Sequence, residues 1–85
     1  MDPYQARIMA DFAIQEFGAT TAAVLTETGS PYPDGLSTAF IEDFTVQGGT
    51  VATHQFYEAG TTDFTKQLLA IAAVEPAVAA VFCQA

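Results

Sequence analysis

An aromatic residue between two prolines is the first feature of this chain that suggests binding chemistry. Tyr32 stands between Pro31 and Pro33, a few residues after an apolar run at positions 22–25 and within a polar loop that also holds Ser30. A tyrosine ring in such a loop can pack on the apolar part of a small ligand while its hydroxyl group bonds a polar part. We therefore take Ser30 and Tyr32 as candidate ligand-binding residues. The alternative is that Tyr32 packs only within its own loop.

Other side chains with chemical potential favour structural roles. His54 has no Asp, Glu or Cys at metal-ligand spacing, which indicates a packed or surface histidine rather than a metal ligand. Cys83 ends an apolar segment and is expected to be a small core residue rather than a nucleophile. Asp63 precedes a helical pattern and is interpreted as a helix cap. Glu27 and Glu58 both follow strand-like segments, where they could bind an ammonium group or remain as solvated rim charges.

Sequence motifs of common enzymes are absent. There is no Gly-x-x-x-x-Gly-Lys phosphate loop, no Gly-x-Gly-x-x-Gly after the first strand and no Gly-x-Ser-x-Gly. A phosphate-accepting receiver domain would need acidic residues after the first and third strands, where this chain has Thr26-Glu27 and Phe82-Cys83. We therefore expect a protein without catalysis that uses no cofactor and no metal ion.

The composition limits the class of protein. Eighty-five residues suffice for one domain at most, and 51% of them are hydrophobic, which argues against disorder. Ten acidic residues against two basic ones give a net charge of −8, which disfavours nucleic acids and anionic membranes as partners. Solubility or a saline habitat explains this acidity more simply than a specific cationic partner. We also expect no signal peptide and no membrane span, because no apolar stretch approaches the ~20 residues that a span needs.

Helical and strand patterns alternate along the chain. The first helix is expected at 3–17, a strand at 21–26, a second helix from Pro33 to about Gln47, a strand at 50–57, a third helix from 61–63 to Glu75 and a strand at 77–82. Each helix shows apolar residues at helical spacing. The expected buried residues are Ile8, Met9, Phe12, Ala13 and Phe17 in the first helix, Leu36, Phe40 and Phe44 in the second, and Phe64, Leu68, Ile71 and Ala72 in the third.

This alternation predicts an α/β fold of three layers with a parallel sheet, built in the order α-β-α-β-α-β. The first strand is apolar throughout and belongs in the centre, whereas the second mixes polar and apolar residues as an edge strand does. The predicted strand order is therefore 2-1-3. The third strand is again apolar, yet nothing in the chain covers its far side. We expect self-association through this edge, giving a homo-oligomer.

Three segments in this order resemble a known family. They are FGATTAAVLTE, SPYPDGLSTAFIEDFTVQGGTV and TTDFTKQLLAIAAVEPAVAAVF. The pattern of Tyr-x-x-Gly-Leu, then Phe followed eight residues later by Gly-Gly, then Thr-Asp-Phe, is similar to the type I periplasmic binding proteins. Within that family it resembles the branched-chain amino acid class, which serves ABC transporters. The resemblance covers nearly the whole chain.

The resemblance implies a fold and a site. Such proteins hold a ligand between two flavodoxin-like lobes joined by a hinge, and residues 1–85 would form one partial lobe, the beginning of the second. Tyr32 matches a ligand-contacting tyrosine of the family, and Gln84 falls near a second contact region where an aromatic residue is common. Pro33 replaces the glycine that usually follows this tyrosine, so the loop is stiffer than in the family.

The expected function is capture of a small polar ligand, for example an amino acid, for uptake by the membrane subunits of an ABC transporter. The resemblance places such a protein in the periplasm or outside the cell. One alternative is a sensor domain that uses the same lobe to detect a ligand. Another is a self-associating α/β fragment that binds no ligand.

Overall fold

Six elements follow one another as the sequence predicts. A computed structural model defines the chain from residue 3 to residue 83. The elements are α1 (Pro3–Phe17), β1 (Thr21–Thr28), α2 (Pro31–Val46), β2 (Thr50–Glu58), α3 (Thr65–Val74) and β3 (Val78–Phe82). The predicted alternation of helices and strands is confirmed. Some boundaries differ by a few residues: α2 begins at Pro31 and not at Pro33, β1 ends at Thr28 and not at residue 26, and α3 begins at Thr65, after the predicted start at 61–63.

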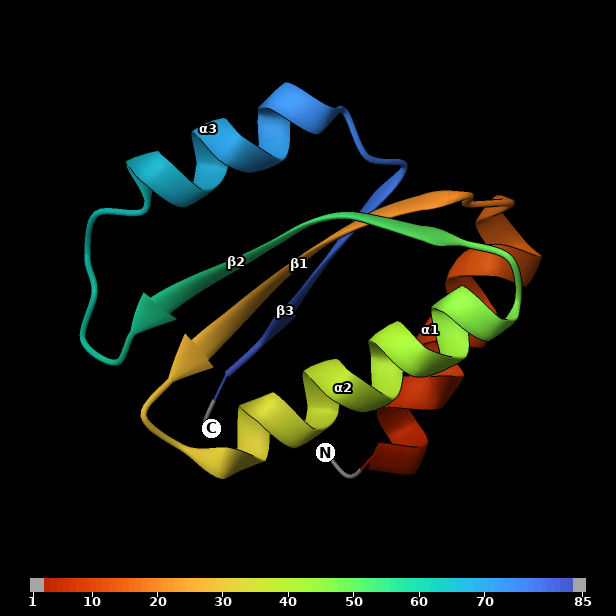
Figure 1. Cartoon of the computed structure of the whole chain (residues 1–85), viewed down its shortest axis with the longest axis horizontal. Helices are drawn as coiled ribbons and strands as arrows, with labels where there is room; N and C mark the ends of the chain where they lie inside the picture. Colours follow the sequence, from red (N-terminus) through yellow and green to blue (C-terminus); the bar gives the residue numbers. More distant parts are fainter. Residues whose placement is uncertain (1–2, 84–85) are drawn as a thin grey trace.

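The three strands form one parallel sheet in the order β2-β1-β3, as predicted. Figure 1 shows α1 and α2 on one side of this sheet and α3 on the other, which gives three layers. Residues 22–26 of the central strand β1 are all buried, because strands pair with both of its edges and helices lie over both of its faces. All three strands run the same way, so their carboxyl ends meet at one edge of the sheet.

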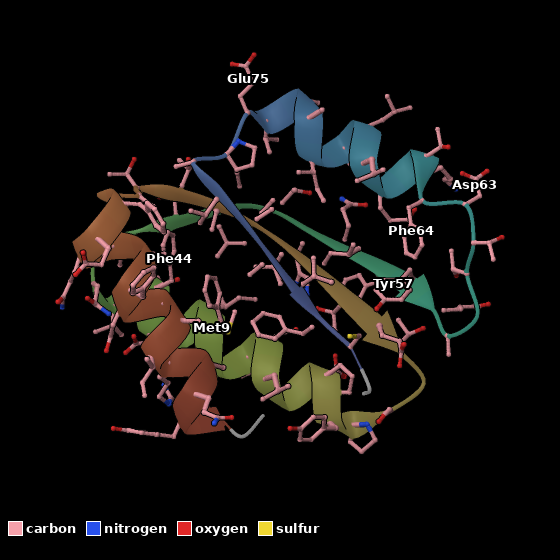
Figure 2. All side chains as sticks on the ribbon, turned by 180° about the vertical axis from the view of Figure 1, so that it is seen from behind. Met9, Phe44, Tyr57, Asp63, Phe64 and Glu75 are labelled. Carbon is pink, nitrogen blue, oxygen red and sulfur yellow. The ribbon has the colours of Figure 1, made fainter. Side chains whose placement is uncertain are left out.

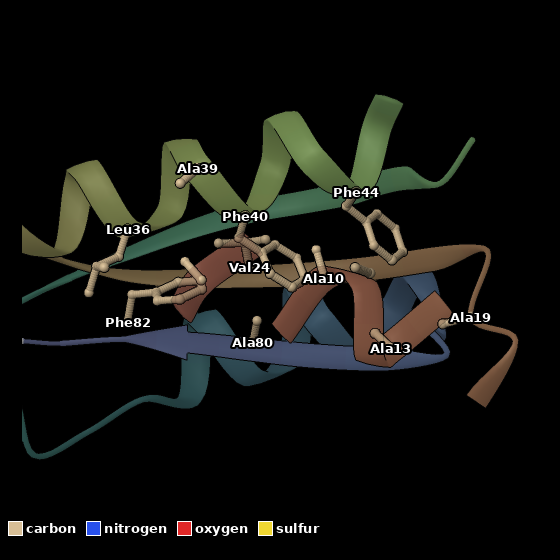
Figure 3. Packing of buried hydrophobic residues seen from close by; sticks show 12 residues of the cluster. Ala10, Ala13, Ala19, Val24, Leu36, Ala39, Phe40, Phe44, Ala80 and Phe82 are labelled. Atoms are coloured by element: carbon tan, nitrogen blue, oxygen red, sulfur yellow. The ribbon is translucent and has the colours of Figure 1, made fainter. Parts of the chain in front are cut away.

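The main core lies between the sheet and α2. Leu36, Phe40 and Phe44 of α2 are buried at helical spacing, which confirms the predicted stripe. The ring of Phe40 stacks on that of Phe44, with 5.5 Å between centroids, and lies 5.7 Å from that of Phe82 in β3. Figure 3 shows these aromatic side chains and Val24 of β1 between the helix and the strands. This cluster fixes α2 on the sheet.

The predicted buried face of α1 was largely wrong. Ile8, Phe12 and Phe17 are 46%, 54% and 68% exposed. The residues of α1 that are buried are alanines at close helical spacing, Ala6, Ala10 and Ala13. Small side chains let a helix approach its neighbours closely, whereas a phenylalanine on that face would hold α1 away from α2 and β1. Packing distance therefore decided which face turns inward, although the prediction for Ala13 is confirmed.

The predicted buried stripe of α3 was also wrong. No residue of α3 is buried, and Leu68 and Leu69 are 58% and 65% exposed. Phe64 lies just before the helix and is partly buried, with its ring in edge contact with Tyr57 at 5.1 Å. Ile71 is only partly buried and Ala72 is exposed. The helix packs mainly over β2, so most of its apolar surface has no neighbour among residues 3–83.

Strand β3 is covered on one face only. Ala80 and Phe82 point into the core, whereas Ala79 and Val81 are exposed, Val81 by 54%. A strand that is apolar throughout is expected to be buried on both faces. The difference arises because α1 and α2 cover one face of β3, while α3 lies over the opposite side of the sheet nearer β2.

Gly49 adjoins the ring of Phe44 so closely that a side chain has no room there. A Cβ at Gly49 would lie 2.4 Å from a ring carbon of Phe44, which is fully buried and cannot move aside. We expect Gly49→Ala to lower the free energy of unfolding by about 1–3 kcal/mol through overpacking. Gly35→Ala is the matched control, since a Cβ in α2 at that position meets no atom within 4 Å.

Urea denaturation measures both variants. Gly35→Ala should raise the free energy of unfolding by about 0.5–1 kcal/mol, because alanine restricts the unfolded chain and favours the helix. Shifts of the same sign in the two variants would contradict the packing at Gly49.

Candidate functional site

The carboxyl edge of the sheet carries the predicted binding residues. Ser30 is the N-cap of α2, with extended backbone angles of −143° and 138°, and its side chain accepts a hydrogen bond from the Tyr32 N–H at 3.4 Å. Tyr32 therefore lies in the first turn of α2 and not in a free loop as predicted. Proline is well tolerated in the first turn, which is why the helix begins at Pro31. The side chain of Tyr32 is 38% exposed.

Strands β1 and β3 flank the topological switch point of the sheet, where the connections between strands lead in opposite directions. The helix after β1 covers one face and the helix before β3 covers the other. In open α/β sheets such a switch point is where ligands bind, beyond the carboxyl ends of the strands. Ser30 and Tyr32 follow β1 at this point. Gln84, the third predicted binding residue, lies outside the described residues.

A row of three side chains crosses this edge on the α3 side of the sheet. Glu27 of β1 is in register with Tyr57 of β2, and Cys83 follows β3. Cys83 is exposed, so its predicted place in the core was wrong, because the α3 side of β3 is uncovered. Burial, together with the Cys83 thiol and the Glu27 carboxylate, raises the pKa of the Tyr57 hydroxyl. Figure 2 shows Tyr57 beside Phe64 at this end of the molecule.

A buried polar chain, which is a row of hydrogen-bonded side chains formed by Thr26, Ser37 and His54, lies on the α2 side of the same edge. Thr26 and Ser37 are 0% and 1% exposed, and their hydroxyl oxygens lie 2.5 Å apart. The Thr26 oxygen also lies 2.7 Å from Nε2 of His54. Ser37 donates a hydrogen bond to the Pro33 carbonyl oxygen at 3.0 Å. The chain thus joins β2, β1 and the first turns of α2.

His54 is a packed histidine, and its ring stacks on that of Phe56 with 4.3 Å between centroids. Burial lowers the pKa of His54, and the negative charge of Asp34 in α2 opposes this effect. The sequence did not predict the contacts of His54, which lies 28 residues from Thr26 along the chain.

The polar chain is not a catalytic arrangement, although it contains serine and histidine. Ser37 is buried and its one proton is donated to a backbone carbonyl, so its oxygen is neither accessible to a substrate nor hydrogen-bonded to the histidine. Within residues 3–83, no group of three His, Cys, Asp or Glu side chains is placed to hold a metal ion. None of the helices in that range is long and apolar enough to cross a membrane.

An open hollow of about 450 Å³ lies beside the candidate site, at the end of β2 and the start of α3. It is lined by Thr28, Phe56, Tyr57, Glu58, Thr61, Asp63 and Gln67. Ser30 and Tyr32 do not line it. Asp63 accepts hydrogen bonds from the N–H and the hydroxyl of Thr65, at 2.9 and 2.5 Å, which lowers the pKa of Asp63. The N-cap position of α3 belongs to Phe64, so the predicted N-cap role of Asp63 was wrong, although its carboxylate accepts from the first N–H of the helix.

Comparison with known proteins identifies the family. The sequence profile described as "Periplasmic binding protein" matches residues 2–85. The chain belongs to this family, whose solute-binding proteins are not enzymes. A search of curated proteins finds no match.

Solved structures share the fold. A leucine-binding protein from Thermotoga maritima is 36% identical with a TM-score of 0.89, over 95% of this chain and 23% of that one. A Streptococcus pneumoniae branched-chain amino acid transporter binding protein, in complex with isoleucine, is 21% identical with a TM-score of 0.81, over 89% and 21% of the two chains. A Rhodopseudomonas palustris solute-binding protein in complex with benzoate is also 21% identical, with a TM-score of 0.85, over 96% and 22%. The last two comparisons show the fold alone, and this chain spans less than a quarter of each protein's length.

Protonation of His54 gives a test of the buried polar chain. The pKa of His54 is lowered by folding, so the unfolded chain takes up this proton first as the pH falls. The free energy of unfolding should therefore fall as the pH drops below about 6.5, the ordinary value, and level off once the folded protein is also protonated.

The matched variant for this test is His54→Gln, which keeps a side-chain N–H donor and does not titrate. Urea denaturation between pH 8 and pH 5 measures both proteins, and other titrating groups such as Asp43 cancel in the difference. Parallel stability curves for the two proteins would show that His54 is not desolvated as the structure indicates.

Proposed function

We propose that this chain is part of a solute-binding protein and contributes one wall of a site for a small amphipathic ligand. The observation that carries this proposal is the position of Tyr32, partly exposed in the first turn of α2 at the carboxyl edge of the central strand. A ring held there offers an apolar surface and a hydroxyl group to a molecule at the switch point. Residues 1–85 are one partial lobe in this proposal, and a second lobe closes over the ligand by a hinge motion.

An amino acid is the ligand class that we favour. The similar structures include a leucine-binding protein, a complex with isoleucine and a complex with benzoate. Each of these three small molecules combines a carboxylate with an apolar group. The net charge of −8 repels an anion such as benzoate more than a zwitterionic amino acid. The Glu27 carboxylate at the same edge suits an ammonium group. Ser30, Tyr32 and Gln84 are the proposed contact residues.

The family also supports a place in transport. Its members are periplasmic or extracellular solute-binding proteins of ABC transporters. We propose the same location for this chain, with the membrane subunits of an ABC transporter as partners and without catalysis. A ligand-sensing domain of the same fold is the alternative, and the domains that accompany the lobe in a longer protein would distinguish the two.

Substitution of Tyr32 tests the site. Tyr32→Ala should weaken binding of L-leucine by at least about tenfold, because the ring provides most of the apolar contact. NMR titration of the ¹⁵N-labelled chain with L-leucine measures the dissociation constant. L-isoleucine and benzoate serve as comparison ligands.

Tyr4→Ala is the control, since Tyr4 is a 71% exposed tyrosine on α1 and is not one of the proposed contact residues. It should leave binding unchanged. Equal affinities of the Tyr32 and Tyr4 variants, or chemical-shift changes confined to other surfaces, would count against the proposal.

We further propose that the chain associates with a second copy of itself through β3. The outer edge of β3 pairs with no strand among the described residues, and its side chains Ala79 and Val81 are exposed and apolar. An unpaired apolar edge is a template for another strand. The other edge strand, β2, is more polar and its register with β1 shifts at Ala22/Ala23, which suits it less to pairing.

A charge on β3 tests this association. Val81→Lys should convert a dimer or larger assembly into monomer, because a lysine on an edge strand opposes pairing. Val46→Lys makes the same change in net charge at an 84% exposed residue at the end of α2 and should leave association unchanged. Light scattering at micromolar concentration measures both variants. A monomeric parent chain would refute the proposal.

A further inference from the structure

We propose that Thr26, Ser37 and His54 form a positioning relay that sets the orientation of Tyr32. The relay is a directed chain of hydrogen bonds from β2 through β1 to the first turn of α2. This proposal rests on the proposed function only in that Tyr32 contacts a ligand. The geometry of the relay does not depend on any ligand.

The direction of each hydrogen bond follows from counting protons. The Pro33 carbonyl can only accept, so Ser37 uses its one proton there. Ser37 must then accept from Thr26, whose hydroxyl oxygen lies 2.5 Å away. The proton of Thr26 is now committed, so its oxygen accepts from Nε2–H of His54 at 2.7 Å. The arrangement therefore requires the Nε2–H form of the histidine ring.

The same count explains why Thr26 cannot lose its hydroxyl group without a loss of stability. Thr26 is completely buried, and a buried hydroxyl group without partners is costly. Its two partners come from two different elements, β2 and α2. Each hydrogen bond of Thr26 therefore also fixes the distance of one element from the central strand.

The relay acts on Tyr32 through the backbone of the next residue. The accepting carbonyl belongs to Pro33, which is buried and follows Tyr32 directly. The proline rings at 31 and 33 each fix one backbone φ angle. The backbone between this carbonyl and the tyrosine therefore has little conformational freedom. The Ser30 cap holds the Tyr32 N–H from the other side. The backbone is thus held on both sides of the tyrosine, at its own N–H and at the carbonyl of Pro33.

Proton uptake by His54 does not reverse the relay. The imidazolium form keeps its Nε2–H, so it still donates to Thr26. Burial lowers the pKa of His54, and the negative charge of Asp34 in α2 opposes this effect by favouring the protonated form. The relay is therefore a fixed support for Tyr32 and not a pH switch.

The first test uses the unmodified chain. Long-range ¹H–¹⁵N NMR of the histidine ring at pH 8 should show the Nε2–H form, and the hydroxyl protons of Thr26 and Ser37 should exchange slowly enough to be observed. A predominant Nδ1–H form would overturn the proposal, because that form cannot donate to Thr26.

The second test compares two substitutions of one residue. Thr26→Val keeps the shape of the side chain and removes the hydroxyl group, whereas Thr26→Ser keeps the hydroxyl group. Thr26→Val should shift the NMR signals of the Tyr32 ring and of the backbone amides of residues 32, 34 and 35, and Thr26→Ser should restore them. Gln55→Ala is the control, since Gln55 neighbours His54 on β2 but bonds Thr53 instead.

Binding of L-leucine separates this proposal from the proposed function. Thr26→Val should weaken binding by about tenfold, because the support of Tyr32 is lost, and Thr26→Ser should restore it. If the Tyr32 signals move as expected but no variant binds leucine, the relay stands and the ligand class is wrong. If the parent chain binds leucine and Thr26→Val changes neither the Tyr32 signals nor the affinity, the relay is wrong. Should Thr26→Val fail to fold, Ser37→Ala provides the same comparison from the other end of the relay.

Discussion

Burial of the central strand is the constraint on which the rest of this structure depends. Strand β1 pairs on both edges and is covered on both faces, so residues 22–26 are all buried. Such a strand must be apolar, and its one buried polar residue, Thr26, must find hydrogen-bond partners within the protein. It finds them in Ser37 and His54. The requirement to satisfy one hydroxyl group thereby links the core to the edge where Tyr32 lies.

The sequence predicted the order of the elements and of the strands, because apolar continuity in β1 and mixed character in β2 are local signals. It predicted the inner face of α2 for the same reason, since Phe40 and Phe44 are both large and correctly spaced. It failed for α1, where the largest residues pointed to the wrong face. Helical spacing finds an apolar stripe, but how closely two helices approach decides whether alanine or phenylalanine is buried. That distance is a property of the whole fold.

The candidate site, like the fold, could be predicted from the sequence only in part. Tyr32 could be found from its type, its flanking prolines and its place after an apolar strand. The start of α2 at Pro31 could have been inferred from Ser30 as a cap, but the second proline drew the prediction two residues too far. The contact of Thr26 with His54 spans 28 residues and leaves no local pattern. A lone threonine closing an apolar run, with a histidine on the neighbouring strand, is the only signal that could have suggested it.

The two faces of the carboxyl edge have different neighbours, and this connects the proposed ligand binding with the proposed association. The Tyr32 side is closed by α2 and supported from within by the polar chain. The opposite side ends in Glu27, Tyr57 and Cys83, where β3 is uncovered. Because Cys83 directly follows β3, any strand that pairs with the free edge of β3 also comes to lie next to that row of side chains. Whatever covers β3 therefore becomes part of the surroundings of the proposed site, so the free edge of β3 and the proposed binding edge cannot be treated as independent surfaces.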